Sequence, residues 1–594
     1  MFRLSCFCLG KRHTKHDIRH TKHDTRLKEV RIYPRVIERI EEWPIFRLSK
    51  DRPAFIREIQ EFTFQRLRSR HRKDLSDVLV KTIYQERIRI KESPWKVDPP
   101  NERQFWNKVS KKLIKKSLDR KDPVANEVAE EILQKIIHRY AEEIVGTFQI
   151  KTFRFAQRFL TAFFNRLFNA AVGKSLRAIF RGRRHLYERL NVVGDVETVS
   201  ALFQKGTVVV VPTHSSNLDS ILVGYAMDQI MGLPSFSYGA GLNLYNFGPA
   251  AYFMNRLGAY RVDRRKKNSI YLETLKAMSN LSIQRGVNSL FFPGGTRSRS
   301  GELETDVKMG LLGTALEAQR AMCQQGSDKK VFVVPMVICY NFVLEAPFLI
   351  EQHLQSTGKE HYIRLKDEGK SIRSWLRFIW RFLSTTSDIT LSVGKPLDVL
   401  GNFVDAEGRS FDRRGTEIDI RDYFSARGQV TEDRQREEEY TKIIAERVVE
   451  RYHIENVVLP SHLVAYAVFE VLMHSHPKLD LFGLLRLPPE DYLFTFRSIE
   501  EVVTQMQTAL FDWELQARIK LAPEIHLSAA EVVTEGISKL GVFHQEKPLE
   551  MTKSGDIVSS NFRVLYFYHN RLANYGLDKT VHWKSEEIEV LKVD

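Results

Sequence analysis

Residues 207–220 read Thr-Val-Val-Val-Val-Pro-Thr-His-Ser-Ser-Asn-Leu-Asp-Ser and divide into a strand, a turn and the start of a helix. Four consecutive valines indicate a strand that is covered on both faces, because a strand exposed on one face alternates apolar and polar residues. Pro212 ends this strand, since proline cannot donate a hydrogen bond to a neighbouring strand. Serine and asparagine, which follow, are residue types that cap helices, so we expect a helix over 217–231.

The pair His214 and Asp219 carries the chemistry of this stretch. Inside one helix, five positions advance about 500°, which leaves the two side chains about 140° apart. Divided between the end of a strand and the first turn of a helix, the two side chains can meet. An ionised Asp219 would then orient the imidazole, which exchanges its proton near neutral pH. His214 is therefore a candidate general base for an attacking hydroxyl, or else a surface histidine beside a capped helix.

The composition indicates a globular protein with acidic partners. The chain has 594 residues, 43% of them hydrophobic, and a formal net charge of +17. This length allows several domains, and the charge favours anionic lipid headgroups, nucleic acid or phosphate-rich substrates. Four cysteines without disulfide or zinc-site spacing fit a reducing compartment. No run of about 18 uncharged apolar residues is present, so we do not expect a helix that spans a membrane.

Periodicity and composition divide the chain into five parts. Residues 1–27 repeat the basic motif Arg-His-Thr-Lys-His-Asp and are expected to form a disordered tail. Residues 28–145 show a charged helical pattern that predicts an all-α domain. Residues 146–400 alternate strands with helices, as in an α/β domain whose mostly parallel sheet is flanked by helices. Residues 401–434 are charged and rich in glycine, which is typical of a linker, and 435–594 are expected to be mainly helical.

The α/β part contains the elements that position the candidate base. Its strands are predicted at 207–212, 258–262, 287–292, 331–339 and 389–394. Its helices are predicted near 217–231, 247–256, 268–285, 306–324 and 371–384. In the C-terminal part, helices are predicted at 435–452, 459–473, 498–518, 528–540 and 562–574, with a hairpin before the last of them.

Two helical stretches combine aromatic and basic residues. In 151–184, phenylalanines alternate with lysine and arginine, so the stretch either lies in a membrane interface or packs its apolar face on the protein. The sequence leaves both possibilities open. In 371–384, Arg373, Arg377 and Arg381 lie nearly opposite an apolar side, and such arginines can reach phosphate headgroups. Because this is the second helix of its kind, we favour contact with an anionic membrane surface.

A glycine-rich motif follows the third predicted strand: Phe291-Phe-Pro-Gly-Gly-Thr-Arg-Ser-Arg-Ser-Gly301. Its paired glycines let the backbone come close to a ligand. Arg297 and Arg299 are two residues apart, so in extended backbone both side chains point the same way and can hold a phosphate monoester. Lys308 can reach the same anion. The motif is not a P-loop, because it lacks the required Gly-Lys-Ser/Thr.

Two further segments belong to the same expected sheet. The segment Gly258-Ala-Tyr-Arg-Val-Asp-Arg-Arg265 ends a short strand with two arginines. Arg264 reaches the sheet edge that carries His214 if the strands are parallel. The segment from Val333 to Glu345 reads as a buried strand that forms a wall of the pocket, and we assign no catalytic residue to it.

Taken in this order, the segments resemble the four sequence blocks of the glycerolipid acyltransferase superfamily. Its first block, His-x4-Asp, is the histidine and aspartate pair described above. The other three blocks match residues 258–264, 292–301 and 334–345. Residues 456–465 and 565–570 are similar to two elements of the branch that acylates glycerol 3-phosphate or dihydroxyacetone phosphate. The resemblance covers the α/β part closely and the C-terminal part loosely.

The resemblance implies transfer of a fatty acyl group from an acyl thioester, acyl-CoA or acyl carrier protein, to the sn-1 hydroxyl of glycerol 3-phosphate. This reaction is the first step of phospholipid synthesis, and it uses neither a cofactor nor a metal. His214 is implied to be the general base and Asp219 its orienting partner. A set of basic residues is implied to hold the acceptor phosphate: Arg264, Arg297, Arg299 and Lys308. Backbone oxyanion donors are implied in the loop formed by Gly294, Gly295 and Thr296.

Three positions depart from the family pattern. Gly294 stands where the third block usually has glutamate, Ser215 where glycerol-3-phosphate enzymes commonly have arginine, and Asn574 where the branch often has histidine. The alternatives are therefore an acyltransferase for a lysophospholipid or dihydroxyacetone phosphate, and an inactive basic protein that binds membranes. We expect a cytoplasmic protein attached peripherally to the cytoplasmic face of a membrane, with no nucleic-acid partner. The sequence does not indicate an oligomeric state.

Overall fold

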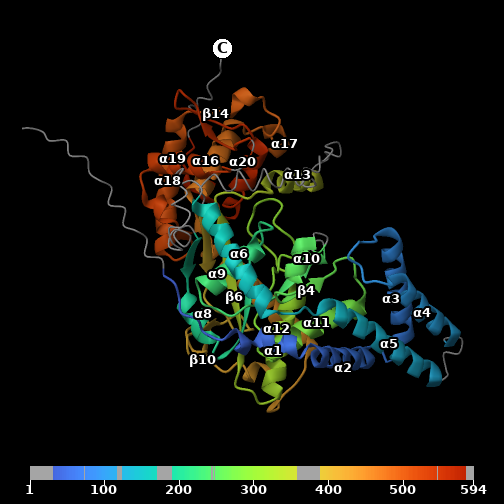
Figure 1. The fold of residues 1–594 in the computed structure, drawn as a ribbon. Coiled ribbons are helices and arrows are strands. Elements are labelled where there is room, and N and C mark those ends of the chain that lie inside the picture. The colour runs from blue at the N-terminus through green and yellow to red at the C-terminus, as the bar shows by residue number, and fades with distance from the viewer. Residues whose placement is uncertain are drawn as a thin grey trace, which may run out of the picture.

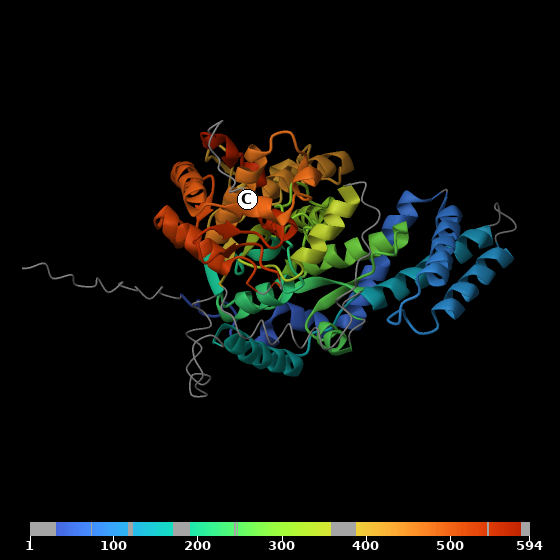
Figure 2. The same cartoon turned by 90° about the horizontal axis from the view of Figure 1, so that it is seen from above.

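A computed structural model describes residues 31–72, 74–116, 123–169, 190–242, 245, 248–357, 388–542, 544 and 546–583. A central sheet lies between a group of N-terminal helices on one side and a group of C-terminal helices on another (Figures 1 and 2). The predicted tail at 1–27 and the predicted amphipathic helix at 371–384 lie outside the described residues.

The central sheet has seven strands in the order β1-β7-β6-β2-β5-β3-β4. Their bounds are β1 (Leu190–Gly194), β2 (Gly206–Pro212), β3 (Ser237–Gly241), β4 (Ala259–Val262), β5 (Ser289–Leu290), β6 (Lys330–Tyr340) and β7 (Ile389–Val393). Neighbouring strands are parallel except β6 and β7, which are antiparallel. The mostly parallel sheet predicted from the sequence is thus confirmed. Because β2, β4, β5 and β6 run in the same direction, the segments that follow them meet at one edge of the sheet.

The valine run lies at the centre of this sheet. Val208, Val209, Val210 and Val211 are fully buried between β5 and β6. Strands β1 and β3 were not predicted from the sequence. Strand β3 reads Ser-Tyr-Gly-Ala-Gly and β1 ends in exposed residues, so neither presents the continuous apolar run that marks β2.

Helices connect the strands and cover the sheet. They are α8 (Val196–Leu202), α9 (Asp219–Gln229), α10 (Gly248–Met254), α11 (Ser269–Gln284), α12 (Met309–Gln324) and α13 (Ala346–Thr357). Helix α9 begins two residues later than predicted. The serine and asparagine that were expected to cap it instead contact Glu345: Ser216 Oγ donates to that carboxylate at 3.0 Å and the Asn217 N–H at 3.1 Å.

In the described residues of the N-terminal region, 31–72, 74–116 and 123–145, the regular elements are all helices, as predicted. Its elements are η1 (Ile40–Glu42), α1 (Pro44–Lys50), α2 (Arg52–Arg70), α3 (Leu75–Glu92), α4 (Glu102–Lys116) and α5 (Pro123–Ile144). This region shares a hydrophobic core with the α/β part, since Ile59 and Ile136 belong to the same buried cluster as Tyr271 and Leu275 of α11. The two parts are therefore packed together through apolar side chains. Helix α6 (Ile150–Asn169) follows and crosses the front of the molecule in Figure 1.

The segment predicted to be a linker is instead folded into short hairpins. Its elements are β8 (Phe403–Val404), β9 (Ser410–Phe411), β10 (Glu417–Ile418), η5 (Asp422–Phe424), β11 (Ser425–Ala426) and β12 (Gln429–Val430). Phe424 is fully buried. The glycines that indicated a linker sit in tight turns, where Gly408 and Gly415 adopt left-handed backbone and Asp405 and Asp412 accept hydrogen bonds from backbone N–H groups.

The C-terminal region is mainly helical, as predicted. Its helices are α15 (Arg434–Glu455), α16 (Pro460–Ser475), α17 (Leu481–Leu484), α18 (Phe496–Leu515), α19 (Ala529–Lys539) and α20 (Phe562–His569). Its short 3-10 helices are η6 (Pro489–Tyr492), η7 (Pro523–His526), η8 (Ala573–Tyr575) and η9 (Leu577–Thr580). Short strands complete it: β13 (Val457–Val458), β14 (Leu493–Phe494), β15 (Lys520–Leu521), β16 (Glu550–Met551) and β17 (Ile557–Val558). Helix α16 is buried over most of its length, which explains its apolar sequence.

Candidate active site

His214 and Asp219 are in contact at the carboxyl end of β2. His214 Nδ1 lies 2.8 Å from Asp219 Oδ2. The histidine follows the strand by two residues and the aspartate opens α9, which is the arrangement that their spacing requires. The Asp219 side chain is fully buried, whereas the His214 side chain is 18% exposed. The imidazole is therefore held on one side and accessible on the other.

The hydrogen bonds of Asp219 determine the tautomer of His214. Asp219 Oδ2 accepts bonds from the backbone N–H groups of Ser215 and Ser216, at 2.7 and 2.8 Å. Its Oδ1 accepts a bond of 2.5 Å from the hydroxyl of Tyr340, and burial together with Asp219 raises the pKa of this hydroxyl well above its ordinary value. A carboxylate that only accepts requires Nδ1 of His214 to donate. Nε2 of His214 is then unprotonated and able to take a proton.

The glycine-rich loop of residues 292–301 packs directly against His214. The ring of Phe292 stacks on the imidazole, with 4.2 Å between the ring centroids. The backbone N–H of Ser298 donates to the carbonyl of His214 at 2.7 Å. The ring and the backbone of the histidine are thus both positioned by this loop.

Glu304 lies beside Gly294, the position where the family pattern has glutamate. Its Oε1 accepts a bond of 2.8 Å from the backbone N–H of His214. A Cβ atom at Gly294 would lie 3.1 Å from Cγ and 3.3 Å from Oε1 of Glu304. Burial raises the pKa of Glu304 above its ordinary value, against the opposing effect of its backbone N–H donors. A carboxylate therefore stands beside position 294 although that residue is glycine.

Glu345 joins the turn after β2 to the loop after β5. In addition to its bonds from Ser216 and Asn217, its Oε1 lies 3.3 Å from NH1 of Arg297. This carboxylate follows β6, so it reaches both neighbours from the same edge of the sheet. Glu345 therefore holds Arg297 near the candidate base.

Arg264 and Arg297 form the cationic side of the site. Arg264 follows β4 and Arg297 follows β5, so both extend from the edge that carries His214. Burial and the charge of Arg297 lower the pKa of Arg264 from its ordinary value. Within the described residues, Arg264 has no carboxylate partner. Two guanidinium groups within electrostatic range of each other are a candidate site for an anion.

The other two predicted phosphate ligands have different neighbours. Arg299 is exposed, and its charge adds to burial in lowering the pKa of His353 on α13. Lys308 packs over the glycine loop, since a Cβ atom at Gly295 would lie 2.6 Å from its Nζ. The structure thus brings Arg264 and Arg297 within electrostatic range and places Arg299 and Lys308 beside other groups.

The three residues proposed as oxyanion donors are not equivalent. Gly295 adopts left-handed backbone with φ of +75°, and its N–H donates to the carbonyl of Phe292 at 3.0 Å. This amide is therefore already used in the turn. The N–H groups of Gly294 and Thr296 donate to no other residue in the described part of the chain. These two amides are the remaining candidates for oxyanion donors.

The C-terminal region holds the far end of the same loop. Asn570 Nδ2 donates to the carbonyl of Ser300 at 2.9 Å. Gly301 lies against the backbone of Phe567, where a Cβ atom would be 2.0 Å from the carbonyl oxygen. The segment at 565–570 that resembles a family element is therefore in contact with the third block.

An apolar cavity of about 260 Å³ lies next to the start of α9. Ser220 and Ile221, which directly follow Asp219, belong to its wall, and Leu290 of β5 lines it from the sheet. Helices α6 and α10 supply aromatic walls through Phe159 and Phe253. The cavity thus begins one residue beyond the aspartate of the candidate site, and its apolar lining fits a hydrocarbon chain.

Sequence reasoning did not identify the roles of Tyr340, Glu304 and Glu345. Tyr340 and Glu345 stand in the fourth segment, which was interpreted only as a wall. A tyrosine that ends a run of apolar strand residues was the available signal, because a buried hydroxyl needs a partner. Glu304 gave no such signal, since its sequence context, Gly-Glu-Leu-Glu-Thr-Asp, reads as a solvated loop.

Among the described residues, no group of three or more His, Cys, Asp or Glu side chains is arranged to hold a metal ion. The absence of a metal or cofactor from the reaction stays a prediction from the sequence.

Residues 189–339 match a protein-family model described as Acyltransferase. The chain is also similar to curated relatives named glycerol-3-phosphate acyltransferase. The relative from Aeromonas hydrophila is 32% identical over 214 residues, which cover 36% of this chain and 23% of the relative. The relative from Pseudoalteromonas atlantica is 26% identical over 277 residues, which cover 46% of this chain and 30% of the relative. The matched part thus spans less than a third of each of these relatives.

A solved structure is also similar to this chain. It is the crystal structure of the 1-acyl-sn-glycerophosphate acyltransferase PlsC from Thermotoga maritima, with 15% sequence identity and a TM-score of 0.23. The similarity covers 63% of this chain and 93% of that chain.

Proposed function

We propose that this chain, in which residues 189–339 match the acyltransferase family model, is an enzyme that transfers a fatty acyl group from a thioester to the sn-1 hydroxyl of glycerol 3-phosphate. The observation that carries the proposal is the contact of His214 Nδ1 with Asp219, which leaves Nε2 free at the edge of the sheet from which Arg264 and Arg297 also extend. A base beside an anion site suits an acceptor that carries both a hydroxyl and a phosphate. The names of the curated relatives support the same acceptor.

The chemistry requires one proton acceptor and no covalent enzyme intermediate. His214 Nε2 takes the proton of the acceptor hydroxyl as its oxygen attacks the thioester carbonyl. The resulting oxyanion is stabilised by loop amides, for which Gly294 and Thr296 are candidates. Collapse of the tetrahedral intermediate expels the thiolate, which takes the proton back from the imidazolium. Asp219 stabilises the positive charge that His214 carries between these two steps.

The acyl chain of the donor would occupy the apolar cavity beside α9. The cavity wall begins at Ser220, so a chain in it would end close to the base at the turn before α9. Its aromatic and aliphatic lining would bury methylene groups, each worth about 0.8 kcal/mol. The donor assay compares coenzyme A with acyl carrier protein as the carrier of the chain.

The test is a matrix of donors and acceptors with the purified protein. We expect palmitoyl thioesters to react with glycerol 3-phosphate, and glycerol to react with a kcat/KM roughly 100-fold lower, because it lacks the phosphate that the arginines bind. Dihydroxyacetone phosphate and a lysophospholipid are included because both remain alternatives. Preference for either of them would assign a different acceptor to the same site. Equal rates with glycerol and glycerol 3-phosphate would exclude the proposed anion site.

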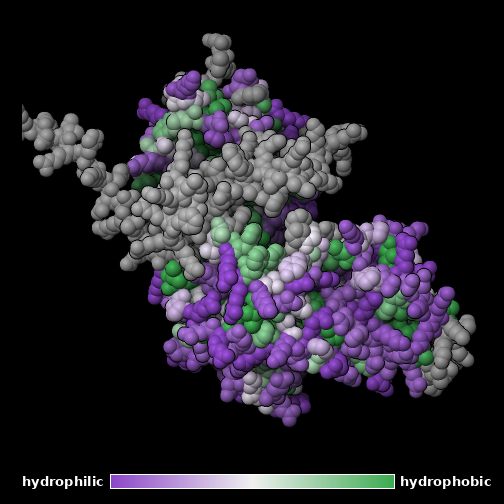
Figure 3. Space-filling model, in the orientation of Figure 1, coloured by the Kyte–Doolittle hydropathy of each residue, from purple (hydrophilic) through white to green (hydrophobic). Residues whose placement is uncertain are grey.

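We further propose that the enzyme works at an anionic membrane surface and that α6 and α10 contact it. Phe155, Phe159 and Tyr252 are 59%, 55% and 51% exposed, and we call them the aromatic face. Figure 3 shows hydrophobic residues between hydrophilic ones where α6 passes α10. Exposed basic residues stand beside the aromatic face on α6: Lys151, Arg154 and Arg158.

The aromatic face also leads to the cavity. Phe159 is exposed and lines the cavity, and Phe155 stacks on Phe253, which lines it too, with 5.9 Å between ring centroids. Phe153 and Ala156 are buried, so one face of α6 packs on the protein. Another face of the same helix presents aromatic rings to the outside. No helix in the described part of the chain is both long and apolar enough to cross a membrane. Contact through the aromatic face needs no such helix.

Flotation with lipid vesicles tests this contact. We expect the parent protein to float with phosphatidylglycerol vesicles more than with phosphatidylcholine vesicles, and less as salt is raised. Phe155→Ser with Phe159→Ser should lower the partition coefficient roughly 10- to 100-fold, since two rings lose apolar contact. Leu515→Ser, at a residue 86% exposed on α18, is the matched control and should float as the parent does. Equal flotation of the parent, the double variant and the control would contradict the assignment.

A further inference from the structure

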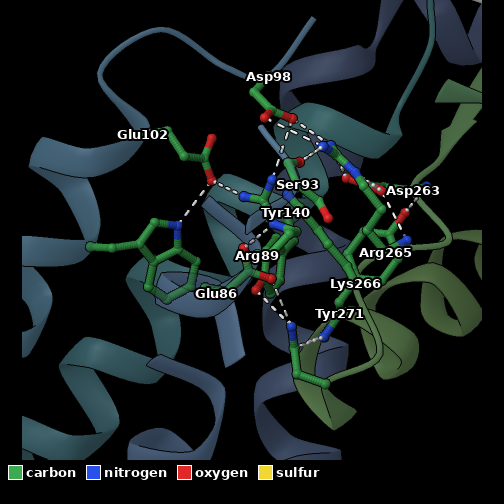
Figure 4. A network of polar contacts seen from close by, with 12 residues as sticks. Glu86, Arg89, Ser93, Asp98, Glu102, Tyr140, Asp263, Arg265, Lys266 and Tyr271 are labelled. Carbon is green, nitrogen blue, oxygen red and sulfur yellow. Dashed lines mark hydrogen bonds and ion pairs between the residues drawn. The ribbon is translucent and has the colours of Figure 1, made fainter. Parts of the chain in front are cut away.

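The loop of residues 263–268, which carries Arg264, is held by the N-terminal helices (Figure 4). It connects β4 to α11 and lies against α3, α5 and the turn between α3 and α4. Figure 4 shows Arg265 and Lys266 directed toward carboxylates and aromatic rings of that region. Arg264 has none of these contacts, although it stands between Asp263 and Arg265.

Arg265 is bound on several sides. Its guanidinium pairs with Asp98 and donates through NH1 to the carbonyl of Ser93 at 2.7 Å. Its Nε donates to Asp263 Oδ1 at 2.9 Å, and its NH2 donates to Asp263 Oδ2 at 2.8 Å. The guanidinium also lies 4.2 Å from the centre of the Trp95 ring. Arg265 thus joins the carboxylate of Asp263 to the N-terminal region.

Lys266 and Asn268 fix the other end of the loop. The Lys266 side chain is almost completely buried, pairs with Glu143, and lies 4.9 Å from the centre of the Tyr140 ring. Asn268 Nδ2 donates to Glu86 Oε1 and to the hydroxyl of Tyr140, each at 3.0 Å. Lys266 is therefore anchored to α5, and Asn268 is anchored to both α3 and α5.

Two of the carboxylates that hold the loop, Glu86 and Asp98, are held in turn by Arg89. This buried guanidinium donates to Glu86 at 2.8 Å, to Glu102 at 2.7 Å and to Asp98 at 3.3 Å. Burial tends to raise the pKa of Asp98, but Arg265, a backbone N–H and Arg89 together lower it below its ordinary value. Asp98 therefore stays ionised and in place between two arginines.

We infer that the N-terminal helical region positions the phosphate-binding arginine of the acyltransferase site, with Asp98 and Glu143 as positioning residues. By keeping Arg265 on Asp98 and Asp263, this region leaves Asp263 unavailable to the adjacent Arg264. Arg264 then remains unpaired next to Arg297 and ready for a phosphate. This inference rests on the proposed function, since it assigns the acceptor phosphate to Arg264.

Asp98→Asn is the test variant, because it keeps the shape of the side chain and removes its charge. Glu273→Gln is the matched control. Glu273 also joins the N-terminal region to α11 through two arginines, Arg66 at 3.3 Å and Arg70 at 2.7 Å. Its side chain is 11% exposed, against 13% for Asp98. Both variants should lower the unfolding temperature, but only the control lies away from the loop.

We expect Asp98→Asn to raise the KM for glycerol 3-phosphate roughly tenfold with little change in kcat. The reason is that the charge-assisted contact between Arg264 and the acceptor phosphate is weakened when the substrate binds, before the acyl transfer step. Glu273→Gln should leave this KM unchanged. Arg264→Gln should raise the KM at least as much as Asp98→Asn does. The double variant Asp98→Asn with Arg264→Gln should match Arg264→Gln alone, because Asp98 acts through Arg264. Equal KM values for Asp98→Asn and Glu273→Gln, or full additivity in the double variant, would overturn the inference.

Calorimetric titration with glycerol 3-phosphate separates this inference from the proposed function. If the parent binds the ligand but transfers no acyl group, the proposed function fails, and a weaker Kd in Asp98→Asn than in Glu273→Gln still supports the inference. If the parent transfers acyl groups and both variants bind equally, the inference fails and the proposed function stands. If the parent neither binds nor transfers, both are wrong.

Discussion

His214→Ala should lower kcat/KM for acyl transfer to glycerol 3-phosphate by about 10²- to 10⁴-fold, the range that a general base contributes. Alanine removes Nε2, the only atom of the pair that can take the acceptor proton. The fold should survive, because Asp219 keeps its donors from Ser215, Ser216 and Tyr340. Steady-state assays with a palmitoyl thioester measure the loss, and thermal unfolding checks the fold.

A second histidine and carboxylate pair provides the control for this prediction. His526 Nε2 lies 3.2 Å from Glu514 in the C-terminal region, and its ring stacks on Phe511. His526→Ala removes an imidazole paired in the same way but outside the candidate site, so its turnover should equal that of the parent. Turnover in His214→Ala that equals the turnover of His526→Ala would eliminate the proposed base.

Gly294→Glu should restore the residue of the family pattern and yet lower the activity of this protein. The new Cβ atom would lie 3.1 Å from Glu304 Cγ, and its carboxylate would enter a site where burial already raises the pKa of Glu304. Two carboxylates in one partly buried space repel each other. Displacement of Glu304 would leave the backbone N–H of His214 without its acceptor, at a cost of about 1–3 kcal/mol. We expect kcat/KM to fall roughly 10- to 100-fold.

The second-site variant Glu304→Leu tests the reason for that loss. Alone, it removes the acceptor of the His214 N–H and should also lower activity. Combined with Gly294→Glu, it leaves one carboxylate in the space, and activity should rise above that of either single variant. Such a coupling would have the size found for residues in contact, about 0.5–3 kcal/mol. A double variant whose losses simply add would show that positions 294 and 304 do not share one role.

The sequence predicted the part of the site that depends on local pattern. The valine run and Pro212 predicted strand β2 and its end, and the interval to Asp219 predicted where the histidine and the aspartate lie. The parallel sheet was predictable because strands and helices alternate. Because parallel strands end at the same edge of a sheet, the edge that carries the candidate site was predictable too.

The remaining part of the site depends on contacts between distant residues. Tyr340 donates to Asp219 from 121 positions away, and Glu345 reaches Ser216 across 129 positions. No periodicity in one sequence encodes such pairs. The hairpins of 401–434 were missed for a different reason, since aspartate and glycine are typical of linkers as well as of tight turns. Strand β3 was missed because its small residues present no apolar run.

The hydrogen bond from Asn570 to the carbonyl of Ser300 joins two residues that lie 270 positions apart in the chain. During synthesis the ribosome releases the strands, the histidine and the arginines long before it reaches that asparagine, at about 5–20 residues per second. A growing chain therefore carries every reactive group of the site for many seconds without the segment that locks the loop. Under the proposed function, the loop beside His214 would reach its final arrangement only after α20 has emerged from the ribosome.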